Sequence, residues 1–432
     1  MRIPIHQPPP PSPVTTSQPP TNGGGGDEDD EPVTIIWAQL LIPGRGQPIN
    51  NGIVALKGDK IDWVGSFLNR PSKYSHITPT YVNVLMPGLW DCHTHFFGME
   101  IEQFVGGGTT FLPGANALAG AITTHDLERT LMAGYTSVRE LAGYAGDLWP
   151  GVKSGMLVGP NIYSAIAALS MTGGHVDVQV EPLPSVIRAM NYTGLPIGVC
   201  DGVDGCTQMV RQMVRRGARC IKVCSSGGVL SLNDDPEDRQ FSDEELKAMV
   251  DEAGRTRRAV AAHAIGKAGI MAALRAGVKS IEHGMYLDEE AADLMLEKDA
   301  IFVEKVTKLV EQSKTSYKLA IKKGIKIALG TDMGSSDVKS SLNHGNNAHE
   351  IVYAVELGMT PLQAIECATA NAPEVLGGMA PQSGQLRAGY DADLIAIRSN
   401  PLEDISVLTK PSNVTHVWKG GKLFKSPPGL PV

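Results

Sequence analysis

Six residues of this chain have the side chains and the spacing of a site for two metal ions. Each stands at the end of an apolar, strand-like run: His93, His95, Lys222, His263, His283 and Asp332. Imidazoles and carboxylates bind divalent ions, and a pair of ions also needs an anion that bridges them. The sequence therefore predicts a binuclear catalytic metal centre, provided that the fold brings the six ends together.

The two histidines at the start of this set are separated by a single residue. On a strand, His93 and His95 therefore point to the same side. The run Pro87–Asp91 precedes them, and active sites of barrel enzymes lie at the carboxyl ends of such strands. Taken alone, this pair, or His263 or His283, is more often structural, so the prediction depends on the joint spacing.

Lys222 lies inside the apolar run Cys220–Cys224. A charged lysine is costly to bury, and desolvation lowers its pKa and makes the amine reactive. Its reaction with CO2 would give a carbamate, an anion able to bridge two cations. The alternative is an ammonium group that reaches the rim or pairs with Asp91 or Asp332.

Asp332 ends the apolar run Ile327–Asp332. Such an acid is either a helix N-cap or, beside metal ions, a ligand that also moves a proton. We predict the second role for Asp332. Together with Lys222, the predicted bridging carbamate, it is one of two predicted catalytic residues.

The elements that must position these residues alternate between strand and helix patterns. Eight apolar strand candidates occur between residues 84 and 375, most of them separated by amphipathic helical segments. This count and size predict an α/β fold, a (β/α)8 TIM barrel over residues 87–375. A doubly wound sheet fits the alternation but would not bring six dispersed strand ends to one centre.

The two ends of the chain differ from this middle part. Residues 1–32 are rich in Pro, Gly and acidic residues and predict a disordered tail. Residues 33–86 and 376–425 are rich in strand formers broken by Gly, Pro and Asp, which predicts one small β-sandwich domain built from both termini. Residues 426–432 form a second tail.

Composition excludes several classes of function. The formal net charge of −8 argues against nucleic-acid binding, which needs a basic face. No apolar run approaches a membrane span, and no apolar segment near the start resembles a secretory signal. We therefore expect a cytoplasmic protein with no membrane partner. The six cysteines are too few and too scattered for a disulfide framework, and we expect buried free thiols.

Several phrases resemble the amidohydrolase superfamily, in its imidazolonepropionase-like and Xaa-dipeptidase branch. They include PGLWDCHTH, KVCSSGG, HAIGKAGI, SIEHG, LGTDMG and GQLRAGYDADLIAI, and the resemblance covers residues 33–425. It implies a hydrolase with two divalent ions, zinc, that cleaves a carboxamide and releases a C-terminal amino acid from an N-acyl amino acid or dipeptide. In this resemblance His93, His95 and Asp332 hold the more buried ion, His263 and His283 hold the exposed ion, and carbamylated Lys222 bridges them.

Three further residues are candidates for substrate binding. His175 follows the third strand candidate, and a histidine there often contacts substrate in the family. Arg139 and Tyr144 end the second strand candidate and would bind a carboxylate by a guanidinium fork and a hydroxyl. The alternatives are a loop-packing role for His175 and a structural salt bridge for Arg139.

Two other functions compete with this interpretation. A cyclic amidohydrolase or deaminase would share the fold, and a non-catalytic scaffold of the fold would have lost ligands, whereas none of the six is missing from this sequence. The partner that we expect is a small-molecule amide, and the assembly a homo-oligomer. The loop of residues 341–347 looks more like that of general dipeptidases, and the span from His283 to Asp332 is short, at 49 residues.

Overall fold

A computed structural model describes residues 31–100, 113–192, 194–229, 231, 233–304 and 311–428. The chain divides into two units, residues 1–32 and 33–432, and every described helix and strand lies in the second. The predicted tail falls almost wholly outside the described residues, and its disorder stays a prediction.

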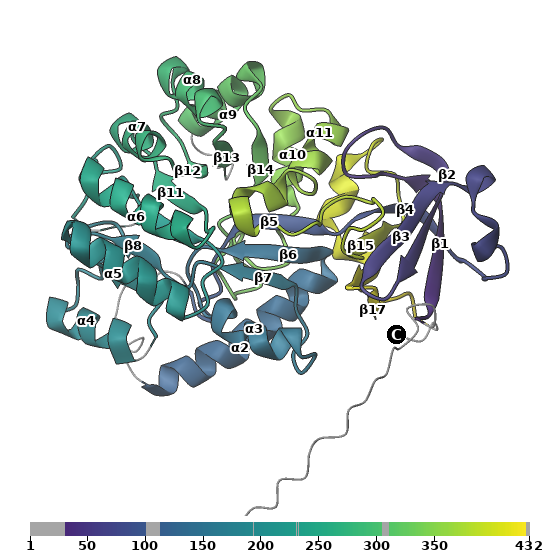
Figure 1. Ribbon diagram of the computed structural model, residues 1–432, viewed down its shortest axis with the longest axis horizontal. Helices are drawn as coiled ribbons and strands as arrows, with labels where there is room; N and C mark the ends of the chain where they lie inside the picture. The colour runs from purple at the N-terminus through teal and green to yellow at the C-terminus, as the bar shows by residue number, and fades with distance from the viewer. Residues whose placement is uncertain are drawn as a thin grey trace, which may run out of the picture. The chain divides into compact units, whose positions relative to one another are not determined.

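Strands from both ends of the chain share one sheet. Its order is β17-β16-β15-β4-β1-β2-β3, and all neighbours are antiparallel except β1 and β4. The purple and yellow strands lie together in Figure 1. The strands are β1 (Val33–Leu41), β2 (Ile49–Lys57), β3 (Lys60–Ser66), β4 (Thr80–Pro87), β15 (Leu394–Ile397), β16 (Val414–Lys419) and β17 (Lys422–Lys425). The joint contribution of both termini is thus confirmed, whereas the folding of this sheet into a sandwich stays a prediction.

The middle of the chain forms two parallel sheets. The first has the order β5-β6-β7 and the second the order β14-β13-β12-β11-β10-β8-β9. Their strands are β5 (Leu89–Thr94), β6 (Tyr135–Glu140), β7 (Asn161–Ser164), β8 (Ala168–Ser170), β9 (Ile197–Val199), β10 (Ile221–Cys224), β11 (Val260–Ala264), β12 (Ser280–His283), β13 (Ile301–Glu304) and β14 (Ile327–Leu329). Apolar side chains on both faces suit strands that are covered on both sides, as parallel sheets are.

Backbone hydrogen bonds join the two parallel sheets on both sides. Beyond β14, Asp332 N donates to His93 O at 2.7 Å and His95 N donates to Met333 O at 2.8 Å. Before β10, Arg219 N donates to the carbonyl of Ser164 at 2.7 Å. These bonds place the carboxyl ends of β5 and β14 side by side.

Helices connect most of the parallel strands and lie outside them, as α5 to α8 do in Figure 1. Capping boxes begin α6 at Ser242 and α11 at Thr360, and Gly277 ends α7 in the left-handed conformation at φ 96°. The helices are α2 (Pro113–Met132), α3 (Ala145–Lys153), α4 (Leu183–Tyr192), α5 (Gly202–Arg215), α6 (Asp243–Arg255), α7 (Lys267–Ala276), α8 (Glu289–Glu297), α9 (Glu311–Lys323), α10 (His349–Glu356) and α11 (Pro361–Cys367).

The third strand candidate differs from its prediction. The apolar run 160–170 forms two strands, β7 and β8, which belong to different sheets. Between them Ile166 adopts φ 71°, and Ser164 Oγ donates to the buried carboxylate of Glu140 while accepting from Ile166 N. The short strand β9, which pairs with β8, was not predicted. A continuous apolar run carries no periodicity that would reveal such a break.

Two expectations from composition concern the whole chain. All six cysteines are buried and unpaired, as expected. None of the described helices is long and apolar enough to cross a membrane.

Candidate metal centre

All six predicted ligand residues line one cavity. Its volume is about 190 Å³. His93 and His95 come from the end of β5, and Lys222, His263 and His283 from β10, β11 and β12, while Asp332 follows β14. Since parallel strands present their carboxyl ends at one face, dispersed positions in the sequence converge at this cavity.

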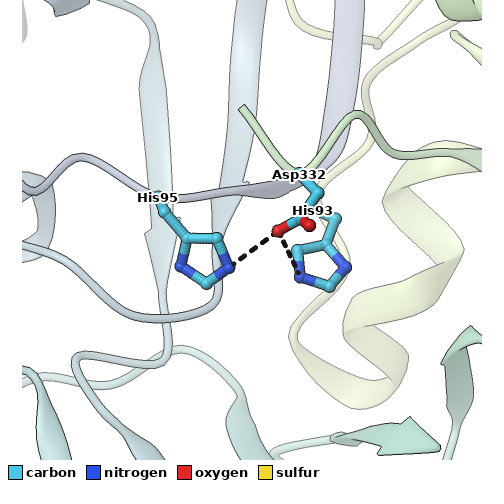
Figure 2. Close-up of side chains that lie close together, drawn as sticks. All are labelled: His93, His95 and Asp332. Carbon is cyan, nitrogen blue, oxygen red and sulfur yellow. Dashed lines mark ion pairs between the residues drawn. The ribbon is translucent and has the colours of Figure 1, made fainter. Parts of the chain in front are cut away.

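His93, His95 and Asp332 form the tightest group in this cavity. One ligand atom from each lies within 4.8 Å of the others. Asp332 Oδ1 is 3.2 Å from His95 Nε2 and 3.5 Å from His93 Nε2, and Figure 2 shows both rings turned toward this carboxylate. Two imidazole nitrogens and one carboxylate oxygen suit a divalent ion such as zinc.

Each of three histidine rings has one nitrogen bonded to an acceptor of the protein. His95 Nδ1 lies 2.9 Å from Ala142 O, and His263 Nε2 lies 3.0 Å from Gly227 O. Since a carbonyl accepts only, these nitrogens carry the protons, and the opposite nitrogens are left as bases. His93 Nδ1 similarly faces a carboxylate, and such outer partners are typical of histidines that bind metal ions.

That carboxylate belongs to Glu282, which is fully buried together with Arg139. Glu282 Oε2 is 3.0 Å from His93 Nδ1, and Arg139 Nη2 donates to both oxygens of Glu282 at 2.8 Å. Burial alone would raise the pKa of Glu282, but the Arg139 guanidinium and the His93 ring hold it well below its usual value. Arg139 does not line the cavity, so the structure favours the salt-bridge alternative over the predicted contact with substrate.

Asp91 holds the backbone beside Asp332 in place through Thr331. The buried Asp91 carboxylate accepts from His93 N, from Thr331 N and Oγ1, and from Asn347 Nδ2 at 2.5–3.1 Å. Asp332 itself adopts φ 54°, a strained conformation for a residue other than glycine. Just before it, a Cβ at Gly330 would lie 2.8 Å from His93 Cβ, so only glycine fits this close approach.

The second group in the cavity contains His263, His283, Lys222 and His175. The His263 ring centre is 4.7 Å from that of His283 and 4.2 Å from that of His175, on which it stacks. His283 adopts φ 72°, so a second predicted ligand also has a strained backbone. Lys222 is 3% exposed, and its burial lowers the pKa of its amine.

Burial also keeps His93, His263 and His283 neutral. It lowers the pKa of His93 to about 4, with the charge of Lys222 acting in the same direction. The pKa values of His263 and His283 lie well below 6.5 for the same reason. Neutral imidazole is the form that binds a metal ion, so the rings are ready to bind near pH 7.

The remaining candidates for substrate binding have different positions. His175 lines the cavity, and its Nδ1 lies 2.6 Å from Ser231 Oγ. Tyr144 is buried, does not line the cavity, and directs its hydroxyl to Asn116 Oδ1 at 3.5 Å. Of the predicted substrate contacts, the structure therefore places His175 alone at the cavity.

Several residues that support the site were not predicted from the sequence. Glu282 had a detectable signal, since it is a charged residue inside the apolar run before His283. Gly228 belongs to the phrase KVCSSGG, and a Cβ there would lie 1.9 Å from the His175 ring. Nothing in the sequence indicated that Asn347 would reach Asp91 or that His344, now seen to be buried, would bond to His95 O at 3.1 Å.

Comparison with known proteins identifies the class. The model of the amidohydrolase family matches residues 84–424. The chain therefore belongs to the amidohydrolase family, has its TIM-barrel fold, and is a hydrolase that acts on amide C–N bonds.

Individual relatives can then be named. The chain is 46% identical to ochratoxinase from Aspergillus niger over 428 residues, which covers 91% of this chain and 87% of the relative. The crystal structure of A. niger ochratoxinase superposes with a TM-score of 0.86 at 45% identity, covering 93% of this chain and 98% of that one.

Two dipeptidase-like structures are also similar. A prolidase complexed with N-methylphosphonate-L-proline has a TM-score of 0.80 at 29% identity and covers 92% of this chain and 100% of its own. A Xaa-Pro dipeptidase with bound methionine in the active site has a TM-score of 0.77 at 30% identity and covers 91% and 100%.

Proposed function

We propose that the protein is a binuclear metal-dependent amidohydrolase that releases a C-terminal amino acid from an N-acyl amino acid or dipeptide. The observation that carries this proposal is the convergence of six ligand-type residues from five strand ends on one cavity. Its fold would be the closed (β/α)8 barrel with a small β-sandwich, which the hydrogen bonds on both sides of the parallel sheets support.

The donor set fits two divalent ions, which we take to be zinc. His93, His95 and Asp332 would hold one ion, and His263 and His283 the other. Lys222, as the carbamate, would supply the anion between them. Burial lowers the pKa of its amine and so favours the unprotonated form, which is the form that combines with CO2. When bound, two such ions lower the pKa of a water molecule and polarise the scissile carbonyl.

The chain's own groups then move the proton. The Asp332 carboxylate reaches into the cavity and can accept the proton of the attacking water. The amine must leave in protonated form, so the same carboxylate would return this proton to the leaving nitrogen. The strained backbone and the Asp91 network hold it at one position for both transfers.

The cavity walls support an apolar substrate group. Beyond the polar residues, its lining includes Phe97, Val178, Ile197, Ile265 and Met285. Among the described residues at the cavity, Lys222 is the only Lys or Arg, and Arg139 does not line it. Ochratoxin A is included as a substrate candidate because of the similarity to ochratoxinase, and dipeptides because of the similarity to the dipeptidases.

The test is a hydrolysis screen with the zinc-loaded protein. N-acyl amino acids, dipeptides and ochratoxin A would be compared with the matching C-terminal amides, which lack the free carboxylate, and with cyclic amides. We expect hydrolysis of linear amides that carry a free carboxylate. Preferential turnover of cyclic amides, or no turnover of any linear amide, would contradict the proposal. A homo-oligomeric assembly stays a separate prediction.

A further inference from the structure

The histidines at the cavity differ in the partner of their outward nitrogen. His95 and His263 each face a neutral backbone carbonyl, of Ala142 and Gly227. His93 instead faces the carboxylate of Glu282 at 3.0 Å. An anionic partner makes an imidazole a stronger base than a carbonyl partner does. Of the three rings, His93 is therefore the strongest ligand for a metal ion.

The Glu282 carboxylate is fixed by a closed set of bonds. Arg139 Nη2 donates to both of its oxygens at 2.8 Å, and Ser280 Oγ donates to Oε1. Arg139 is itself held by Cys92 O at 2.5 Å and by Ser280 Oγ at 2.9 Å. Since Arg139, Ser280 and Glu282 are all 0% exposed, water cannot replace these bonds.

These bonds also connect separate strands. Arg139 lies on β6, Glu282 and Ser280 lie on β12, and Cys92 precedes His93 on β5. The ion pair therefore crosses the interior of the fold from β6 to β12 and ends at one ring of the cavity. Glu282 Oε2 contacts His93 Nδ1 as well as Arg139, so the pair is directed at a ring of the cavity.

We infer that Glu282 and Arg139 are positioning residues that fix the tautomer and orientation of His93 and so make the metal position of His93, His95 and Asp332 the tighter of the two. The inference rests on the proposed binuclear function. Glu282 accepts from His93 Nδ1 and so presents Nε2 to the cavity, and the two bonds from Arg139 hold the Glu282 carboxylate in the orientation that faces His93.

The experiment is a zinc titration of chelator-treated, full-length protein in competition with a chromophoric chelator. In the parental protein we expect two binding steps. Glu282→Gln should weaken the tighter step by about 10–100-fold, the usual cost of losing an outer partner, and should change the weaker step by less than about threefold.

The matched control is Glu140→Gln. Glu140 is also a fully buried carboxylate at the end of a parallel strand, but its hydrogen bonds go to Ala145 N, Gly146 N and Ser164 Oγ, and among the described residues none goes to a candidate ligand. It should leave both zinc steps unchanged, even where it lowers the melting temperature.

Glu282→Gln leaves the buried Arg139 without its anionic partner and can prevent folding. A milder variant of the same pair is therefore tested beside it. Ser280→Ala removes one hydrogen bond from each member of the pair and should weaken the tighter step by about two- to tenfold. The inference would be overturned if folded Glu282→Gln bound zinc at the tighter step with parental affinity. If Glu282→Gln does not fold, parental affinity of Ser280→Ala at that step would overturn it. Absence of zinc binding by the parental protein would instead overturn the proposed function.

Discussion

The two halves of the cavity are assembled differently. In the first half, one ligand atom from each of His93, His95 and Asp332 lies within 4.8 Å of the others, and the Asp332 carboxylate supplies a negative charge. The His263 and His283 half has two neutral rings and the buried amine of Lys222. One half thus has its own anion, whereas the other obtains one only if Lys222 is carbamylated.

This difference shows which part of the site depends on the chain alone. Asp91 and Glu282 fix the first half through the protein's own hydrogen bonds. If Lys222 is carbamylated as proposed, the second half relies on that carbamate for its only anion, whereas the first half also has Asp332. Occupancy of the second half should therefore vary with CO2 more than that of the first.

The largest effect should come from Asp332→Asn. Asparagine retains an oxygen for a metal ion but cannot accept the proton of the attacking water. Loss of a general base costs about 10²–10⁴ in rate, so kcat should fall at least about a hundredfold while KM changes far less and metal content is largely retained.

The matched control for this variant is Asp337→Asn, because Asp337 is exposed on the same loop and caps Lys339 N. Its kinetics should equal those of the parental protein. Near-parental kcat for Asp332→Asn would show that Asp332 does not transfer the proton.

Lys222→Ala tests the second half directly. Loss of the bridging anion should lower activity by about tenfold or more, and acetate or propionate should restore part of it by supplying a carboxylate. Lys279→Ala is the control, since Lys279 pairs with Asp299 away from the cavity. An unmodified Lys222 in the electron density of active, fully metal-loaded protein would refute the carbamate.

A smaller effect is expected from His175→Ala. His175 lines the cavity and stacks on His263, but none of the first half depends on it. Loss of one hydrogen bond and one ring contact with substrate should raise KM by about tenfold, with kcat less affected. An unchanged KM measured by steady-state kinetics would favour the loop-packing alternative.

Tyr144→Phe should have the smallest effect. The hydroxyl of Tyr144 points to Asn116 and not into the cavity. We expect kcat/KM to stay within about twofold of the parental value, because only one long hydrogen bond is lost. A tenfold loss of kcat/KM that is specific to substrates with a free carboxylate would support the contact between Tyr144 and substrate that the sequence predicted.

The sequence predicted the meeting of the ligand-type residues because strand ends in a parallel βα fold converge by geometry. It could not assign Arg139, since β6 is buried on both faces and its periodicity does not distinguish the cavity side from the other. The partner Glu282 lies 143 positions away, and only the fold brings them together. The break at Ile166 was equally hidden, because β7 and β8 read as one apolar run.

The most direct test of the central claim is anomalous diffraction at the zinc edge from crystals of protein purified without chelators, together with elemental analysis. We expect about two ions per chain, roughly 3.5–4 Å apart, one bound by His93, His95 and Asp332 and the other by His263 and His283. Protein that contains no divalent ion, or ions bound away from these residues, would contradict it.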